Sequence, residues 1–127
     1  MRLLDTDVLV DIRRGFTPAE QWYMSLVERP GVPGFVAMEL VAGCRDKMEL
    51  QRLQTFLFGL PIIWPSEADC QRGLEHLRDY KLSHSLGLID ALIAATAIGQ
   101  GATLCTFNVK HFSAVPGLVT EQPYSRT

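Results

Sequence analysis

The segment that most constrains this chain is the apolar stretch at residues 88–98, with the sequence LIDALIAATAI. Every side chain in it is apolar except Asp90 and Thr96. A helix that is apolar on all sides belongs in a protein interior. An ionised carboxylate buried there without a partner would carry a large desolvation cost. Asp90 is therefore expected to cap a helix, to pair with another group or to hold a cation.

The composition is typical of one globular domain with a substantial core. The chain has 127 residues, of which 47% are hydrophobic. No apolar run reaches the roughly 18 residues that a membrane helix needs, and charged Arg2 and Asp5 come too early for a secretory signal. The three cysteines are widely spaced and form no CxxC pair, which favours a reducing cytoplasm over a disulfide framework or a zinc site. The net charge of -2 argues against a protein that binds nucleic acid by bulk charge.

Short apolar strands alternate with helical segments along the chain. Strands are expected at residues 2–5, 32–36, 61–64 and 102–106, with a possible edge strand at 118–120. Helices are expected to begin at residue 6 and to cover 18–29, 37–44, 46–58, a segment from 66 through 77, and 88–98, with a polar loop at 81–87 and a short turn at 108–112. This alternation predicts an α/β fold with a parallel sheet covered on both faces. We expect a single domain over residues 1–127, with a loose tail after about residue 122.

Acidic side chains fall where the predicted strands end. Asp5 closes the first strand, Glu39 lies in the first turn of the helix after the second strand, and Asp90 begins a helix that enters the sheet from the same side. Thr106 and Asn108 follow the fourth strand. Ligands of open parallel sheets bind at this edge, because strand ends and helix amino termini converge there. Three carboxylates and an amide are therefore expected to lie close together.

Such a cluster of acids repels itself and raises its own pKa values. A divalent cation reverses the sign of that cost. Oxygen ligands without Cys or His suit Mg²⁺ or Mn²⁺. These ions activate a water molecule and stabilise the leaving oxygen when a phosphodiester bond is hydrolysed. Phosphodiester hydrolysis is the leading hypothesis from the residues alone.

Each acid also has an ordinary structural explanation. Asp90 and Glu39 are first-turn residues of the kind that a helix dipole favours. Asp5 can simply cap the helix that follows it. Asp7 is interpreted mainly as a helix-start residue. The metal hypothesis therefore depends on all three principal acids reaching one edge of the sheet.

Four blocks carry these residues in a fixed order: LDTDVLVD at 4–11, MELVAG at 38–43, DALIAATA at 90–97 and TFNVKHF at 106–112. In that order and spacing the chain resembles the PIN-domain ribonucleases, specifically the VapC-type toxins of bacterial toxin–antitoxin pairs. The resemblance implies a three-layer α/β/α sandwich with a short, mostly parallel sheet of four to five strands. It also implies Mg²⁺- or Mn²⁺-dependent endonucleolytic cleavage of RNA by a cytoplasmic homodimer that a cognate VapB-type antitoxin silences.

The resemblance assigns roles to residues of this chain. Asp5, Glu39 and Asp90 match the acidic, metal-binding positions of the family. The fourth catalytic position, often Asp, is Asn108 here, and an amide brings no charge to a second metal ion. The number of metal ions, one or two, therefore stays open. Thr6, Asp7 and Thr106 are expected to support the metal ligands.

Two surfaces are candidates for partners. Arg14 and Lys110 lie nearest in sequence to the predicted site and are the best candidates for contacts with RNA phosphates. The alternative for each of them is ordinary solvated surface charge. The same two explanations apply to the other basic residues, which are Arg13, Arg45, Lys47, Lys81 and His111. A second cluster, consisting of Tyr23, Met24, Leu26, Phe56, Leu57 and Phe58, carries more apolar bulk than two small helices need. It predicts either core packing or a groove for a partner helix.

Two other functions compete with the nuclease hypothesis. A receiver-type phosphoacceptor domain needs an aspartate at the end of its middle strand, but residues 50–66 contain no acid, and Ile63, Trp64 and Pro65 occupy the expected place. A catalytically silent PIN-like module that binds RNA or protein is the stronger alternative. Sequence alone separates it poorly from the enzyme, because the three principal acids are present in both.

Overall fold

All five strands in the computed structural model, which describes residues 1–127, run parallel. They are β1 (Arg2–Leu4), β2 (Val32–Pro33), β3 (Ile62–Ile63), β4 (Thr103–Cys105) and β5 (Val119–Glu121). Strand β4 pairs with β1 on one side and with β5 on the other, and β2 pairs with β3. A parallel bridge between Leu3 and Gly31 joins the two groups. The strands therefore follow the spatial order β3-β2-β1-β4-β5.

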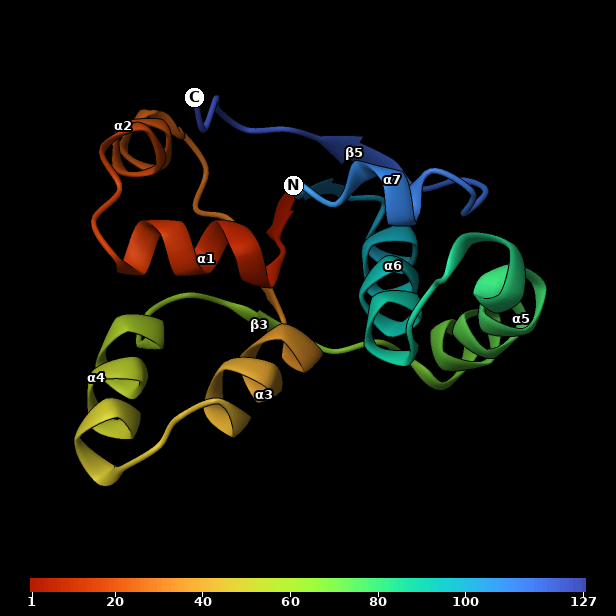
Figure 1. Ribbon diagram of the computed structural model, residues 1–127, viewed down its shortest axis with the longest axis horizontal. Helices are drawn as coiled ribbons and strands as arrows, with labels where there is room; N and C mark the ends of the chain where they lie inside the picture. The colour runs from red at the N-terminus through yellow and green to blue at the C-terminus, as the bar shows by residue number, and fades with distance from the viewer.

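Seven helices surround these strands: α1 (Thr6–Arg13), α2 (Thr17–Ser25), α3 (Gly34–Ala42), α4 (Lys47–Leu57), α5 (Glu67–His84), α6 (Leu88–Gln100) and α7 (Val109–Phe112). Helices α1 to α4 lie on the left of Figure 1 and α5 and α6 on the right, with the start of β1 between them. The predicted α/β class with parallel strands is confirmed. None of the helices combines the length and the hydrophobicity needed to cross a membrane.

Helix α6 forms the centre of the core, as its sequence predicts. Ala91 and all residues of 93–97, Thr96 among them, are buried. The hydroxyl of Thr96 donates to the carbonyl oxygen of Leu92 at 2.7 Å, which satisfies the polar atom inside the helix. Small residues let α5 approach closely, and a Cβ built on Gly73 would lie 3.4 Å from the Ala91 carbonyl oxygen. The start of α6, and with it Asp90, is thereby held against the sheet.

Several predicted element bounds differ from the structure. The strand expected at 32–36 contains only Val32 and Pro33, because α3 already begins at Gly34. Gly34 is required there, since a Cβ would overlap the ring of Trp64. Glu39 consequently lies in the middle of α3 and not in its first turn. The helix expected at 18–29 ends at Ser25, and α5 continues through most of the expected polar loop to His84.

The tail, defined as residues 123–127, differs most from expectation. The sequence predicts a loose segment, but Tyr124 and Arg126 both bind the Asp11 carboxylate on α1. The ring of Tyr124 also packs against Phe16, Trp22 and Phe107. These partners are distant in sequence, so no local pattern reveals the packing.

Candidate active site

Asp5 lies at the centre of the candidate site. Leu4 of β1 stands opposite Cys105 of β4, so Asp5 and Thr106 follow next on two neighbouring strands. The Asp5 side chain is 4% exposed. Its Oδ1 accepts from the Thr6 backbone N–H at 2.8 Å, which caps α1, and its Oδ2 accepts from the Thr106 hydroxyl at 2.7 Å. Asp5 therefore does cap a helix, and it also reaches across the sheet.

The surroundings of Asp5 disfavour the ionised form of its side chain. Burial raises its pKa to about 6, against the hydrogen bonds from Thr106 and Thr6, which lower it. The negative charges of Asp7 and Asp90 contribute to this increase in pKa. Neither Asp5 nor these two neighbours forms an ion pair with a basic side chain. The site therefore favours a proton or a cation at this position.

Glu39 reaches the same edge through Thr6. Its Oε1 accepts from the Thr6 hydroxyl at 2.7 Å, so a residue adjacent to Asp5 tethers the side chain. Glu39 is exposed, whereas Asp5 is buried. The structure thus places Glu39 on the rim of the site, although its helix begins earlier than the sequence predicts.

Asp90 is half-buried in the first turn of α6. Its Oδ2 lies 3.3 Å from the position that a Cβ on Gly87 would take, so the carboxylate folds back over the amino end of the helix. It accepts no hydrogen bond from within the protein. The negative charge of Asp90 raises the pKa of Asp5, and it is the contribution that comes from α6. Asp90 therefore lies near enough to Asp5 to raise the pKa of that carboxyl group, and its own oxygens accept no hydrogen bond.

Two hydrogen bonds tie the loop after β4 to α1. The buried Thr106 hydroxyl donates to Asp5 and accepts the backbone N–H of Asn108 at 3.0 Å. Asp7 Oδ2 accepts the backbone N–H of Phe107 at 2.9 Å, and its Oδ1 accepts that of Val8 at 2.8 Å. The side chain of Asn108 makes no capping hydrogen bond and is exposed. Thr106 and Asp7 thus bind the supporting structure, while the Asn108 amide is free to bind a ligand.

The donor set suits a hard divalent cation in type and in charge. It consists of carboxylate and amide oxygens, and the carboxylates repel one another without a basic partner. The carboxylates lie farther apart than in a preformed metal site, because no three His, Cys, Asp or Glu side chains are close enough together to hold a metal ion. The predicted ligands Asp5, Glu39 and Asp90 are therefore brought to one edge of the sheet, and they would have to move inward to share an ion.

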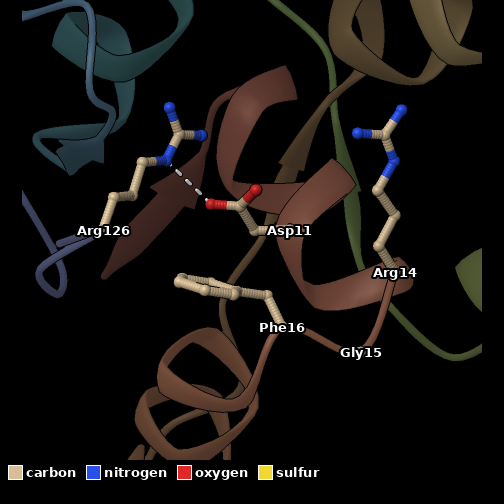
Figure 2. Close-up of a pocket in the computed structure, with 5 residues that line it drawn as sticks. All are labelled: Asp11, Arg14, Gly15, Phe16 and Arg126. Atoms are coloured by element: carbon tan, nitrogen blue, oxygen red, sulfur yellow. Dashed lines mark hydrogen bonds and ion pairs between the residues drawn. The ribbon is translucent and has the colours of Figure 1, made fainter.

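Basic side chains line two open hollows next to α1. Figure 2 shows the first, where Arg14 and Arg126 flank Asp11 and the ring of Phe16. The second lies between α1 and α4, and Arg13, Arg14 and Arg52 line it. Arg52 and Arg126 are absent from the sequence prediction, because nothing in their local sequence relates them to α1. Lys110 is exposed on α7 and forms no ion pair.

An apolar groove runs between α3 and α4. Its lining residues are Gly34, Ala37, Met38, Val41, Ala42, Gln54, Leu57, Phe58, Ile62 and Trp64. Phe58 is 89% exposed and Trp64 is 55% exposed. Leu57 and Phe58 belong to the apolar cluster predicted from the sequence, but Tyr23 and Leu26 do not line this groove. The reason is that α2 packs against α1, whereas α4 packs against α3.

Comparisons with known proteins agree with this architecture. The PIN domain family matches residues 2–118. The chain is 36% identical over 128 residues to ribonuclease VapC19 of Mycobacterium tuberculosis, and the match covers 98% of this chain and 100% of the relative. Among solved structures, a toxin–antitoxin complex from Klebsiella pneumoniae superposes with a TM-score of 0.80 at 28% identity, covering 98% of this chain and 99% of that chain. VapBC2 from Rickettsia felis, solved with a DNA fragment from its promoter, gives a TM-score of 0.78 at 29% identity, with 94% and 96% covered.

Proposed function

Because the chain belongs to the PIN-domain family and is a homologue of its VapC ribonuclease toxins, we propose that it hydrolyses RNA phosphodiester bonds at the Asp5 site as the toxin of a toxin–antitoxin pair. The observation that carries the proposal is the buried Asp5 carboxylate. It sits at the carboxyl edge of a parallel sheet, near two further carboxylates and with no basic partner. Such an arrangement suits an enzyme that binds a cation and a polyanionic substrate at one place.

Asp5, Glu39 and Asp90 would hold Mg²⁺ or Mn²⁺, with Asn108 as a neutral fourth ligand. When bound, the cation would supply Lewis-acid activation of water and stabilisation of the leaving oxygen. The tether from Thr6 restrains Glu39 on the rim, and the free Asp90 carboxylate can turn inward from the start of α6. Asn108 supplies no charge, which favours one tightly held ion over two.

Thr106 and Asp7 would orient the ligands without touching the substrate. The Thr106 hydroxyl accepts the Asn108 N–H, so its own hydrogen is directed at Asp5 Oδ2. This fixes the Asp5 carboxylate plane and leaves its remaining lone pairs to face the site. Asp7 holds the Phe107 backbone and so keeps the loop after β4 near α1. Thr6 performs the matching role for Glu39.

The substrate backbone would lie along the basic hollows. Arg14 lines both of them, and Arg13 and Arg52 add two further charges on one side. Neither Arg14 nor Arg52 forms an ion pair with a carboxylate. Unpaired guanidinium groups bind phosphates well because their donors match the phosphate oxygens. Lys110 on α7 is the corresponding candidate next to Asn108.

The groove between α3 and α4 would receive an antitoxin helix. Two of the similar structures contain a toxin together with its antitoxin. The groove is lined mostly by apolar side chains, and amphipathic helices dock into such surfaces through residues one turn apart. We further propose that the toxin is a homodimer that acts in the cytoplasm, where its RNA substrate is found and its three free cysteines stay reduced.

A cleavage assay separates this function from a silent binding module. RNA is incubated with the purified protein and Mg²⁺ or Mn²⁺, with and without EDTA, beside Asp5→Asn and Asp90→Asn variants. Asp79→Asn is the matched control, because Asp79 is exposed on α5 and forms no ion pair. We expect cleavage by the wild type and the control only, and none in EDTA. Equal cleavage by all four proteins would indicate a contaminating nuclease, and RNA binding without any cleavage would favour the silent module.

A further inference from the structure

The tail (residues 123–127) is attached to α1 through the Asp11 carboxylate and through the Asp7 carbonyl oxygen, which accepts from Arg126 Nη2 at 3.4 Å. Asp11 Oδ2 accepts from the Tyr124 hydroxyl at 2.8 Å and from Arg126 Nε at 2.9 Å. Figure 2 shows Arg126 directed at Asp11 across the opening of the hollow. Tyr124 also packs against the rings of Phe16 and Trp22, with centroids 6.1 and 6.0 Å apart. The tail therefore has a defined position against α1 and α2.

From this position the tail holds Phe107. The rings of Tyr124 and Phe107 meet edge to face, with centroids 4.9 Å apart. The guanidinium carbon of Arg126 lies 4.0 Å from the centre of the Phe107 ring, which is a cation–π contact. The backbone N–H of Phe107 is bound by Asp7, which lies one helical turn before Asp11. Helix α1 thus binds Phe107 directly through Asp7. It also holds Phe107 indirectly, because Asp11 binds the tail residues that pack against the Phe107 ring.

Phe107 stands between two residues of the candidate site. Thr106 before it binds Asp5, and Asn108 after it presents the free amide. We propose that Tyr124 and Arg126 are positioning residues that fix Phe107, and through it Thr106 and Asn108, relative to Asp5. This inference rests on the proposed ribonuclease site. Small displacements of reacting groups can cost about a hundredfold in rate, so a clamp on this loop has a function beyond stability.

The test compares Arg126→Ala, Arg126→Lys and Tyr124→Phe with two controls. Arg78→Ala removes an exposed arginine on α5 that makes no ion pair. Ser66→Ala removes the capping box of α5 and so lowers the melting temperature without touching the loop. Three measurements are made on each protein: hydrogen exchange of the 106–109 segment in metal-free protein, calorimetric titration with Mn²⁺, and kcat and KM on RNA.

For Arg126→Ala we expect faster exchange at 106–109, weaker Mn²⁺ binding, and a kcat that falls about tenfold to a hundredfold with little change in KM. Tyr124→Phe keeps the ring and loses one hydrogen bond, so its effects should be in the same direction and smaller. Arg126→Lys keeps the charge beside Asp11 but not the guanidinium group over the Phe107 ring, and should recover part of the loss. The two controls should leave all three measurements at the wild-type level, although Ser66→Ala lowers the melting temperature.

The inference is overturned if exchange at 106–109 is unchanged in Arg126→Ala, or if Ser66→Ala reproduces its effects. A rise in KM with constant kcat would also overturn it, because Arg126 would then be an RNA contact. If the wild type cleaves no RNA, the proposed function fails, but the exchange and Mn²⁺ titrations still decide whether the tail positions the loop.

Discussion

At the scale of single residues, the raised pKa of Asp5 determines how the stability of the metal-free protein depends on pH. A carboxylate with a higher pKa in the folded than in the unfolded protein binds its proton more tightly when folded. It therefore favours folding below its unfolded pKa, and that contribution is lost as the pH rises through the folded pKa. The pKa of Asp5 rises from 3.8 to about 6. Burial also raises the pKa of Asp7, which acts in the same direction.

The metal-free protein should consequently lose stability between about pH 4 and pH 6. A rise of about two pKa units for Asp5 corresponds to roughly 3 kcal/mol of unfolding free energy. Urea unfolding in EDTA at several pH values measures the loss. Asp5→Asn should flatten the profile and, at neutral pH, be as stable as the wild type or about 1 kcal/mol more stable. A variant that is clearly less stable than the wild type in EDTA would contradict this account of the charge.

The Thr106 hydroxyl provides a second test at the same scale. Thr106→Val keeps the shape but removes both the donor to Asp5 and the acceptor for the Asn108 N–H. We expect kcat to fall about tenfold to a hundredfold, because both groups lose their fixed orientation. Thr106→Ser keeps the hydroxyl and should retain most of the activity. Steady-state kinetics on one RNA substrate compare the two variants, and a Val variant as active as the Ser variant would show that the hydroxyl does not orient the site.

At the scale of elements, the contact between α5 and α6 determines where Asp90 stands. The close approach depends on Gly73, whose Cβ position lies 3.4 Å from the Ala91 carbonyl oxygen and 3.5 Å from the Ala95 Cβ. These distances accommodate a methyl group but no larger side chain. Packing of small residues, and not a polar link, therefore holds the helix that carries Asp90.

Gly73→Leu should force α5 away from α6 and lower the free energy of unfolding by about 1–3 kcal/mol. Activity should fall as well, since the start of α6 would shift with Asp90. Gly73→Ala is the matched control and should be close to the wild type or slightly more stable, because alanine favours helix. Urea unfolding followed by circular dichroism measures both proteins. A Leu variant as stable as the Ala variant would show that the two helices are not tightly packed.

At the scale of the whole molecule, the proposed catalytic edge and the proposed antitoxin groove are separate surfaces. Helix α3 connects them, since it presents Glu39 to the site and Met38 and Val41 to the groove. A partner that binds the groove therefore lies against the helix that carries one of the proposed ligands. Occupation of the groove can in this way be coupled to the site.

Phe58→Glu should abolish binding of the antitoxin without unfolding the toxin. Phe58 is 89% exposed, so its replacement costs little in the free protein, but a charge in the groove opposes an apolar helix face. Co-purification with the co-expressed cognate antitoxin is the measurement. Met24→Glu is the control, because Met24 is 82% exposed and lies outside the groove. Retention of the antitoxin by the Phe58 variant would place the docking surface elsewhere.

The sequence by itself determined the fold class, the interior position of α6 and the placement of Asp5 at a strand end. These features depend on local patterns: an apolar helix, short apolar strands and a carboxylate directly after one of them. The capping box of α5, formed by Ser66 and Asp69, depends equally on residues that are close in the sequence. The order and spacing of the four blocks identified the family for the same reason.

Only the tertiary structure decided which distant groups meet. The bonds from Thr106 to Asp5, from Thr6 to Glu39 and from the tail to Asp11 join residues that are 101, 33 and more than 100 positions apart. Pairing of β1 with β4 creates the first of these, and packing of aromatic rings around Phe107 creates the last. Such contacts depend on the path of the whole chain. Neighbouring residues alone therefore predict a loose tail, whereas in the folded protein the tail packs against α1 and Phe107.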